Sequence, residues 1–439
     1  MSRLLITNAR LVDPVSGRDD AGAIAIDGER IAIVARDGAA DSRLRDFEPT
    51  RTIDARGAIV VPGLVDLAAR LGEPGHEHAG LLESELAAAV AGGVTSLVCP
   101  PDTDPVLDEP GLVEMLKFRA RSLNLARLYP LGALTHGLAG ESLTEMAELS
   151  EAGCIGFAQA DVAVRDTLVL HRALQYASTF GYTVWLRPND AWLGNGVAAK
   201  GPLATRLGLS GVPVLAETIA LATIFELMRD TGARVHLCRL SSAAGVDLVR
   251  RAKDEGLPLS CDASIHQLHL IDVDIGYFDA AMRLVPPLRQ QRDRDAIRAA
   301  LADGTIDALV SDHTPVGEDA KHLPFAEAEP GATGLELLLG SALKWGSASK
   351  LSLAQTLSTV TSRPAAVLAR SGSTTVPPAG ALEEGALADL CVFAAEEWWT
   401  VDGTTLASRS HHTPFAQHEM PGRVRCTLVA GALAFDAAE

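Results

Sequence analysis

The chain has 439 residues, 47% of them apolar and 4% aromatic, and it carries a net charge of −18. This length is sufficient for one large α/β domain and a smaller unit, and the acidic balance argues against nucleic acid or an anionic membrane as a partner. The sequence has no apolar run of the roughly 18 to 20 residues that a membrane-spanning helix needs, and its strand pattern begins too early for a signal peptide, so we expect a cytoplasmic protein.

Both ends of the chain show the pattern of antiparallel β-strands. Residues 3–60 alternate short apolar runs with turns, and the same alternation returns at residues 388–393 and 424–431. Neither end has enough strands for a core of its own, so we predict one small β domain built from residues 1–60 and 372–439. Within the second segment, residues 372–385 are rich in Ser, Thr, Pro and Gly and are predicted to be a linker.

The central residues 61–371 show strands followed by helices, such as the helices predicted at residues 80–91 and 243–255. Eight strands with intervening helices predict a (β/α)8 TIM barrel, in which the active site lies at the carboxyl ends of the strands. The predicted strands comprise residues 58–66, 95–99, 128–133, 155–157, 183–186, 234–238, 257–261 and 308–311.

Several short motifs resemble those of one enzyme family. They lie at residues 62–66, 73–75, 91–95, 286–289, 303–307, 311–315 and 413–415. Together they resemble the dihydroorotases of the amidohydrolase superfamily, and the resemblance covers nearly the whole chain. It implies an α/β fold, a TIM barrel of the amidohydrolase type with a small β domain built from both termini. It also implies a barrel mouth where two zinc ions, or one, activate a water molecule for attack on a cyclic amide.

The resemblance places the metal ligands of the family on this sequence, and most of them are lost. The four ligand histidines correspond to Ala68, Arg70, Arg187 and Arg239. Alanine has no donor atom, and an arginine stays protonated, has no lone pair to offer and would repel a metal ion.

One member of the metal constellation remains. The bridging carboxylate corresponds to Gln159 or Ala160, and Asp161 lies one place late, where the alternation of strand side chains is expected to turn it away. Asp312, which binds metal and takes the proton of the attacking water in the family, is retained as a vestigial catalytic residue. A catalytic zinc needs about three protein ligands, so we expect no metal and no other cofactor.

The positions that bind substrate in the family are altered as well. Gly72 stands where the family has an arginine that binds the substrate carboxylate, and Asp102 and Val285 stand in place of two asparagines. An aspartate would repel a carboxylated substrate, and a valine offers no polar partner. His266 matches a histidine on the substrate side of the family site.

The other histidines and the cysteines are predicted to have structural roles. His76 and His78 form an HxH pattern in a predicted surface loop, where solvated side chains are expected. His236 matches a family histidine that binds no metal and is predicted to be a hydrogen-bonded core residue, and His411 and His412 are predicted to be structural. The six cysteines are scattered without a CxxC pair, which favours reduced core thiols.

Three of the four lost histidines have become arginines, and we expect these three side chains to converge near Asp312. Like charges in a partly enclosed mouth need counter-charges. We therefore expect Asp312, with Asp161 or Glu73, to pair with at least one arginine, or an anion or ordered water to fill the gap.

An intact scaffold with a disabled site resembles the non-catalytic pseudo-dihydroorotases that assemble with the catalytic chain of aspartate carbamoyltransferase. The first hypothesis is therefore an inactive homologue that serves as a structural subunit of that enzyme in pyrimidine biosynthesis, within a homo-oligomer or a hetero-oligomer. The alternative is an active dihydroorotase or related cyclic amidohydrolase with an atypical site, which would use zinc or a metal-free mechanism.

Overall fold

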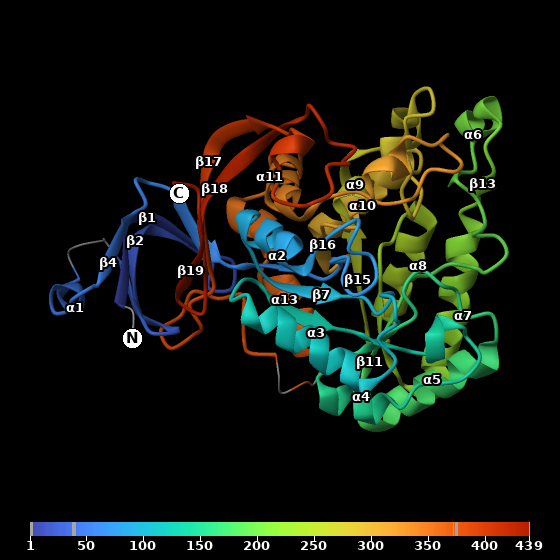
Figure 1. Ribbon diagram of the computed structural model, residues 1–439, viewed down its shortest axis with the longest axis horizontal. Helices are drawn as coiled ribbons and strands as arrows, with labels where there is room; N and C mark the ends of the chain where they lie inside the picture. The colour runs from blue at the N-terminus through green and yellow to red at the C-terminus, as the bar shows by residue number, and fades with distance from the viewer. Residues whose placement is uncertain (1–2, 37–40, 372, 374–375, 439) are drawn as a thin grey trace.

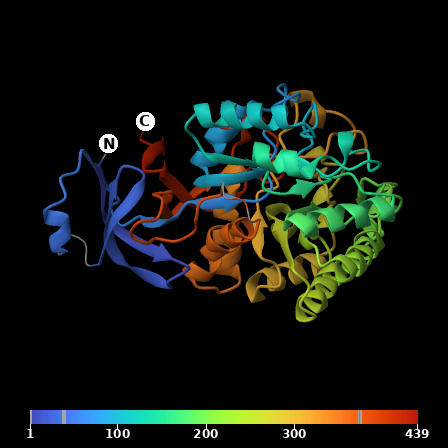
Figure 2. The ribbon, with the colours of Figure 1, turned by 90° about the horizontal axis from the view of Figure 1, so that it is seen from below.

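The structure, a computed structural model, describes residues 3–36, 41–371, 373 and 376–438. Strands from both ends of the chain form a β domain at one end of the molecule, and the central residues form a barrel beside it (Figure 1). Figure 2 shows both termini on the side of the β domain and helices around the barrel strands. Three residues of the predicted linker, 372, 374 and 375, lie outside the described residues.

The β domain is one sheet with the strand order β19-β18-β17-β5-β1-β2-β3, in which β4 pairs with β1. The two ends of the chain meet where β17 pairs antiparallel with β5, so the predicted origin of this domain from both termini is confirmed. Ile6, Leu11, Ile24, Val60 and Leu390 are fully buried in its core. The strands are β1 (Arg3–Asp13), β2 (Arg18–Asp27), β3 (Arg30–Arg36), β4 (Arg51–Asp54), β5 (Ile59–Pro62), β17 (Leu390–Thr400), β18 (Glu419–Val429) and β19 (Ala432–Asp436).

The strand predicted at residues 58–66 is in fact two strands in different sheets. β5 belongs to the β domain, whereas β6 (Leu64–Asp66) is the first strand of the barrel. Gly63 lies between them, and a Cβ atom there would lie 2.2 Å from Thr95 Oγ1. Because the apolar run continues through this change of sheet, its period could not reveal the break.

The remaining parallel strands form the predicted (β/α)8 barrel. Strands β6, β7 and β8 pair in one sheet, and a second sheet has the order β16-β15-β14-β11-β10-β9. A bridge between Ala69 and His313 joins the first strand position to the last. β10 and β15 begin two residues later than predicted. The barrel strands are β6, β7 (Val94–Cys99), β8 (Arg127–Pro130) with its continuation β9 (Gly132–Ala133), β10 (Phe157–Ala158), β11 (Thr183–Leu186), β14 (Arg234–Leu237), β15 (Leu259–Ser264) and β16 (Ala308–Val310), while β12 (Ala198–Ala199) and β13 (Gly211–Val212) form a small sheet of their own.

Most of the helices surround the barrel, whereas α1 lies on the β domain beside β3 (Figure 1). In α8, Ser242 caps the first turn by accepting the N–H of Gly245, and Val246, Val249 and Ala252 are buried at spacings of three residues. Among the described residues, no helix combines the length and apolar character needed to cross a bilayer. The helices are α1 (Ser42–Arg45), α2 (Leu82–Ala91), α3 (Pro110–Ser122), α4 (Met146–Ala152), α5 (Thr167–Phe180), α6 (Pro202–Leu207), α7 (Leu215–Thr231), α8 (Ala243–Asp254), α9 (Ile265–His269), α10 (Gln291–Asp303), α11 (Leu338–Ala348), α12 (Leu353–Ser358) and α13 (Ser362–Ala369).

Candidate functional site

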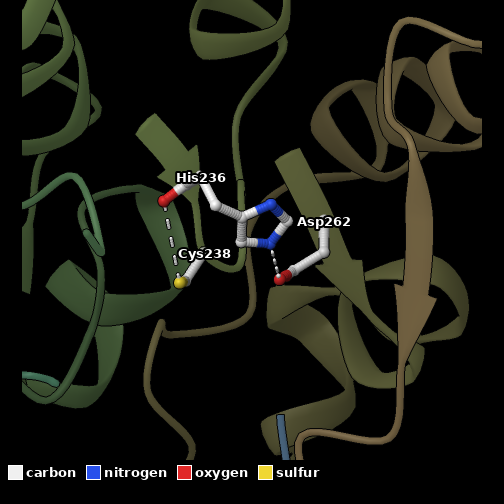
Figure 3. Close-up of side chains that lie close together, drawn as sticks. All are labelled: His236, Cys238 and Asp262. Atoms are coloured by element: carbon white, nitrogen blue, oxygen red, sulfur yellow. Dashed lines mark hydrogen bonds and ion pairs between the residues drawn. The ribbon is translucent and has the colours of Figure 1, made fainter. Parts of the chain in front are cut away.

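Strands β14 and β15 position the first arginine of the site through a buried polar pair. His236 is fully buried, and its Nε2 lies 2.9 Å from Asp262 Oδ2 while its Nδ1 lies 2.8 Å from Ser260 Oγ (Figure 3). The other oxygen of Asp262 accepts the backbone N–H of Arg239 at 2.7 Å. Arg239 has a φ of 55°, an uncommon value for a residue other than glycine, and this hydrogen bond supports it. His236 is thus a hydrogen-bonded core residue, as the sequence predicts.

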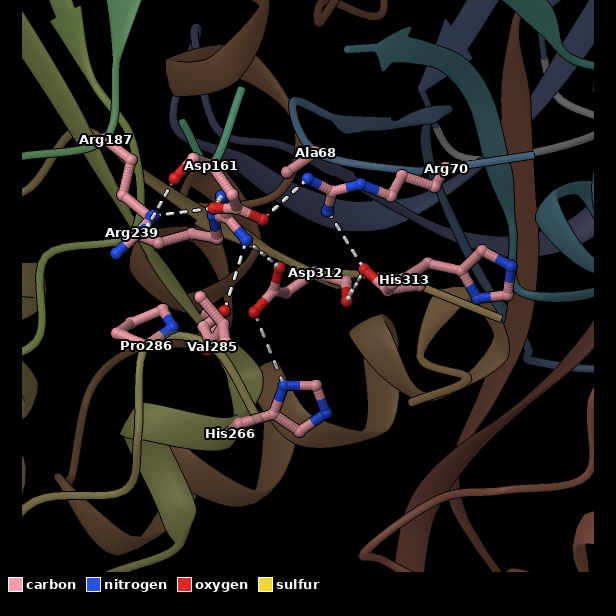
Figure 4. A network of polar contacts seen from close by, with 12 residues as sticks. Ala68, Arg70, Asp161, Arg187, Arg239, His266, Val285, Pro286, Asp312 and His313 are labelled. Carbon is pink, nitrogen blue, oxygen red and sulfur yellow. Dashed lines mark hydrogen bonds and ion pairs between the residues drawn. The ribbon is translucent and has the colours of Figure 1, made fainter. Parts of the chain in front are cut away.

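The guanidinium group of Arg239 lies at the centre of the barrel mouth (Figure 4). Its Nη1 donates to Asp312 Oδ1 at 3.1 Å and to the carbonyl oxygen of Val285 at 3.2 Å. Its Nη2 donates to Asp161 Oδ1. Arg239 therefore binds two carboxylates at once, those of Asp161 and Asp312.

Asp161 is the point at which all three arginines meet. Arg70 Nη2 donates to Asp161 Oδ2 at 2.8 Å, and Arg187 Nε forms an ion pair with Asp161 Oδ1 at 2.6 Å. Arg187 Nη2 also donates to the backbone carbonyl of Asp161 at 2.9 Å. The expected convergence of the three arginines is observed, and both Asp161 and Asp312 supply counter-charge.

The prediction that Asp161 would point away from the ligand direction is wrong. β10 ends at Ala158, and Ala160 then adopts a φ of 49°. Since the backbone has left the extended conformation, the alternation of strand faces no longer fixes the direction of the next side chain. Asp161 turns into the mouth as a result.

Arg70 links this centre to a second carboxylate. Its Nε and Nη2 donate to Asp102 Oδ2 at 2.9 and 2.8 Å, and its Nη1 donates to Thr314 Oγ1 at 3.1 Å. From the sequence, Asp102 was expected only to repel an anionic substrate. In the structure it is the ion-pair partner of Arg70.

The network is balanced in formal charge, because three guanidinium groups face the carboxylates of Asp102, Asp161 and Asp312. Burial alone would raise the pKa of the Asp161 carboxyl, but the three guanidinium groups, led by that of Arg239, hold that pKa well below its usual range. Asp161 is therefore ionised at any physiological pH, and no further anion is needed to neutralise the arginines.

The residues present do not fit the zinc centre of the family. Ala68 offers no donor atom, and the other three positions that the resemblance assigns to ligand histidines carry protonated groups that are already paired. Gln159 is buried and engaged elsewhere, since its Nε2 donates to Leu138 O at 2.8 Å and its Oε1 accepts from Thr135 Oγ1 at 3.0 Å. Asp312 is left beside a guanidinium group, which is an unfavourable place for a divalent cation.

Two positions that the resemblance assigns to substrate binding, Gly72 and Val285, offer no polar side chain. Gly72 has a φ of 75°, and a Cβ atom there would lie 2.2 Å from the carbonyl oxygen of Gly80, so this loop conformation has no room for the family's arginine. Val285 contributes only its backbone carbonyl, which accepts from Arg239.

His266 remains close to the retained aspartate. It is buried, its ring stacks on Phe415 with 5.7 Å between centroids, and its Nδ1 lies 3.7 Å from Asp312 Oδ2. Neither ring nitrogen makes a hydrogen bond within the described part of the chain.

Residues 73–78, in the later part of the loop after β6, lie outside the network. The expectation that Glu73 could pair with one of the three arginines is wrong. Its carboxylate instead pairs with Arg119 and accepts the N–H of Leu82. His76 and His78 are exposed, as predicted, and border a cavity of about 210 Å³ whose wall also includes Arg70 and Asp102.

Two contributors were not identified from the sequence. Thr314 lies in the matched motif at residues 311–315, so its position beside Asp312 could have suggested a contact with the mouth. Asp262 belongs to none of the matched motifs. It directly follows the strand predicted at residues 257–261 and faces His236 on the neighbouring strand. The outlying pair His411 and His412 bonds to backbone carbonyls of Gly403 and Glu318, in keeping with a structural role.

Comparisons with known proteins identify the family of this chain. A family model described as dihydro-orotase-like matches residues 57–244, and one described as the amidohydrolase family matches residues 214–434. A "Dihydroorotase-like protein" of Pseudomonas aeruginosa is 41% identical over 429 residues, which cover 98% of each chain. A "Dihydroorotase-like protein" of Pseudomonas putida is 42% identical over 97% of each chain, and a "Dihydroorotase" of Syntrophotalea carbinolica is 36% identical over 99% of this chain and 99% of its own.

Solved structures show the same fold at lower identity. An L-hydantoinase (dihydropyrimidinase) from Arthrobacter aurescens superposes with a TM-score of 0.87 and 23% identity, over 100% of this chain and 97% of that one. A D-hydantoinase (dihydropyrimidinase) from Thermus sp. gives a TM-score of 0.81 and 20% identity, over 99% and 96%. At these identities the likeness concerns the fold alone.

Proposed function

Because this chain belongs to the dihydroorotase-like proteins of the amidohydrolase family, we propose that it is a catalytically inactive member that assembles with the catalytic chain of aspartate carbamoyltransferase. In this role it stabilises the oligomer of that enzyme in the cytoplasm and hydrolyses nothing itself.

The observation that carries the proposal is the arginine–aspartate network of the barrel mouth. In an active amidohydrolase this space must hold a metal-bound water and the substrate amide. Here Arg70, Arg187 and Arg239 meet Asp161 and Asp312 in that space, so the polar groups satisfy one another. The fold is retained without the chemistry that it serves in active relatives.

The choice of partner rests on the resemblance to the pseudo-dihydroorotases that accompany aspartate carbamoyltransferase. The two Pseudomonas relatives, named only "Dihydroorotase-like protein", are consistent with a lineage set apart from the enzymes. Large apolar side chains on the surface also favour assembly: Trp192 is 72% exposed and Tyr277 89% exposed. Aromatic residues are enriched in stable protein interfaces, which bury about 1,200 Å² or more in total.

The test is co-expression with the cognate aspartate carbamoyltransferase chain, followed by size-exclusion chromatography and assay of carbamoyl transfer. We expect the two chains to elute together and the transferase to lose its large assembly when this chain is left out. The Asp312→Asn variant removes the retained carboxylate. At temperatures where circular dichroism shows it folded, it should assemble as well as the wild type, because the role requires no hydrolysis. Separate elution at micromolar concentration, with a transferase fully assembled and active alone, would refute the proposal.

One observation favours the alternative of an active cyclic amidohydrolase. His266 and Asp312 are adjacent and buried, and His266 has two ring nitrogens free to exchange a proton within the described residues. If this pair acts on dihydroorotate or a hydantoin, hydrolysis by the purified protein must survive a metal chelator and disappear in the His266→Asn variant.

A further inference from the structure

A second group of potential metal ligands lies in the barrel beside the arginine–aspartate network. His236 and Cys238 are two residues apart at the end of β14, and Asp262 lies opposite them on β15. One donor atom from each, the imidazole nitrogen, the thiol sulfur and a carboxylate oxygen, lie within 4.8 Å of one another (Figure 3). We propose that His236, Cys238 and Asp262 form a binding site for a thiophilic divalent cation such as Zn²⁺.

The two buried ligands are oriented by bonds made through their other atoms. His236 Nδ1 lies 2.8 Å from Ser260 Oγ, so a proton on Nδ1 can be donated to that hydroxyl while Nε2 presents its lone pair. Asp262 Oδ1 accepts the N–H of Arg239 at 2.7 Å, which leaves Oδ2 facing Nε2 at 2.9 Å. Partners of this kind fix the tautomer and direction of metal ligands in proteins.

The donor set suits zinc in both type and charge. Zinc in proteins binds nitrogen and oxygen at about 2.0 Å and thiolate sulfur at about 2.3 Å. The thiol loses its proton to solvent when the ion binds, and the ring proton of His236 moves to Nδ1. The thiolate and the carboxylate of Asp262 then neutralise the two charges of the ion, so the balance of the neighbouring network does not change.

The surroundings leave one direction open for a fourth ligand. Trp185 packs against the His236 ring on one side, with 4.1 Å between ring centroids. His236 and Asp262 are fully buried, whereas Cys238 is partly exposed, so a water molecule can complete the coordination from the side of the thiol.

This site is distinct from the zinc centre of the family. It uses none of the positions at Ala68, Arg70, Gln159, Arg187, Arg239 and Asp312. Cys238 directly precedes Arg239, whose guanidinium group is turned to Asp161 and Asp312. An ion at the new site would link β14 to β15 next to the network, and its role would be to stabilise the fold.

Cobalt titration of the full-length chain tests the proposal. The protein is reduced, stripped of metal with a chelator and titrated with Co²⁺, whose bond to a thiolate gives a charge-transfer absorption band. We expect one equivalent to bind, with this band and the visible bands of tetrahedral cobalt. Cys238→Ser should abolish the charge-transfer band, while Cys99→Ser, which alters another buried cysteine near the mouth, should retain it.

Two further variants separate ligation from folding. Ser260→Ala removes only the partner of His236 Nδ1 and should weaken Co²⁺ binding about 10- to 100-fold. Asp262→Asn keeps an oxygen for the Arg239 N–H and should weaken it more. All variants are compared at temperatures where circular dichroism shows them folded. The absence of a cobalt band in the folded wild type, or a band that persists unchanged in Cys238→Ser, would overturn the proposal, and neither result depends on assembly with a transferase.

Discussion

At the scale of single residues, Asp161 takes the central place in the barrel mouth. Its carboxylate is held by the cationic side chains of Arg70, Arg187 and Arg239. Such a centre is stable only as long as each charge keeps its partner.

Asp161→Asn should therefore destabilise the protein. Removing one partner of a buried ion pair costs about 3 to 5 kcal/mol, and we expect about 3 kcal/mol here because the Asp161 side chain is 32% exposed. Urea denaturation followed by circular dichroism measures the change. Asp247→Asn, which breaks the exposed pair with Arg250, is the control and should cost less than about 1 kcal/mol. Equal effects of the two substitutions would contradict a central role for Asp161.

Gly72 tests whether the loop after β6 excludes the family's substrate-binding arginine. Gly72→Ala should destabilise by more than about 1 kcal/mol, because it combines a positive φ with a close approach to the carbonyl oxygen of Gly80. Gly181 has a similar φ of 73° with nothing within 4 Å of its added Cβ. Gly181→Ala therefore measures the cost of the backbone conformation alone. If urea denaturation gives the same loss for both variants, the steric argument is wrong.

At the scale of elements, the sequence predicts most of the barrel because its strands are apolar runs between turn signals. It did not reveal the break at Gly63, where one apolar run serves two sheets. It also gave the wrong direction for the Asp161 side chain. The left-handed conformation of Ala160 lies beyond the end of the strand, and the alternation of apolar and polar residues does not indicate it. The sequence could identify the arginines of the mouth as residues that bind no metal, because this follows from the chemistry of the side chain alone. Their partners depend on contacts between strands.

Helix α9 carries a histidine whose titration should affect stability. His269 Nε2 lies 2.9 Å from the carbonyl oxygen of Ser341 in α11, and burial lowers the pKa of His269 to about 4. The unfolded chain, with an ordinary histidine pKa near 6.5, binds more protons between pH 6.5 and 4. The His269 contribution to stability is therefore present above pH 6.5 and is lost as the pH falls toward 4.

His269→Gln, which keeps a donor for Ser341, should lose less stability over this range than the wild type. Urea denaturation at several pH values between 4 and 7.5 gives the difference between the two proteins. This comparison is needed because other groups titrate in the same range with the opposite sign; burial raises the pKa of Asp66 to about 6, for example. Identical pH dependence in both proteins would show that His269 is not the group responsible.

At the scale of the whole molecule, the C-terminal segment joins the β domain to the barrel mouth. After β17 the chain returns to the barrel, where Phe415 stacks on His266 and the carbonyl oxygen of His412 accepts the N–H of Thr333. Ser408 Oγ donates to Glu85, which also bonds to His313. The strand patterns predicted the β domain from both termini, but they could not show this return, because it is made by loops.

The central claim is that this chain does not hydrolyse dihydroorotate. It rests on a barrel that is retained while the arginines and aspartates at its mouth pair with one another. A single reversion, Arg70→His, should not restore activity, because catalytic groups that act as a unit do not contribute additively. It would also leave Asp102 without its arginine partner while the other ligand positions remain lost.

The most direct measurement is dihydroorotate hydrolysis by the purified wild-type protein, free of host enzyme, with and without added zinc. We predict no turnover above that of a chelator-treated sample under either condition. Zinc-dependent turnover that disappears in the Asp312→Asn variant would show that the mouth assembles a working metal centre, and would contradict the account.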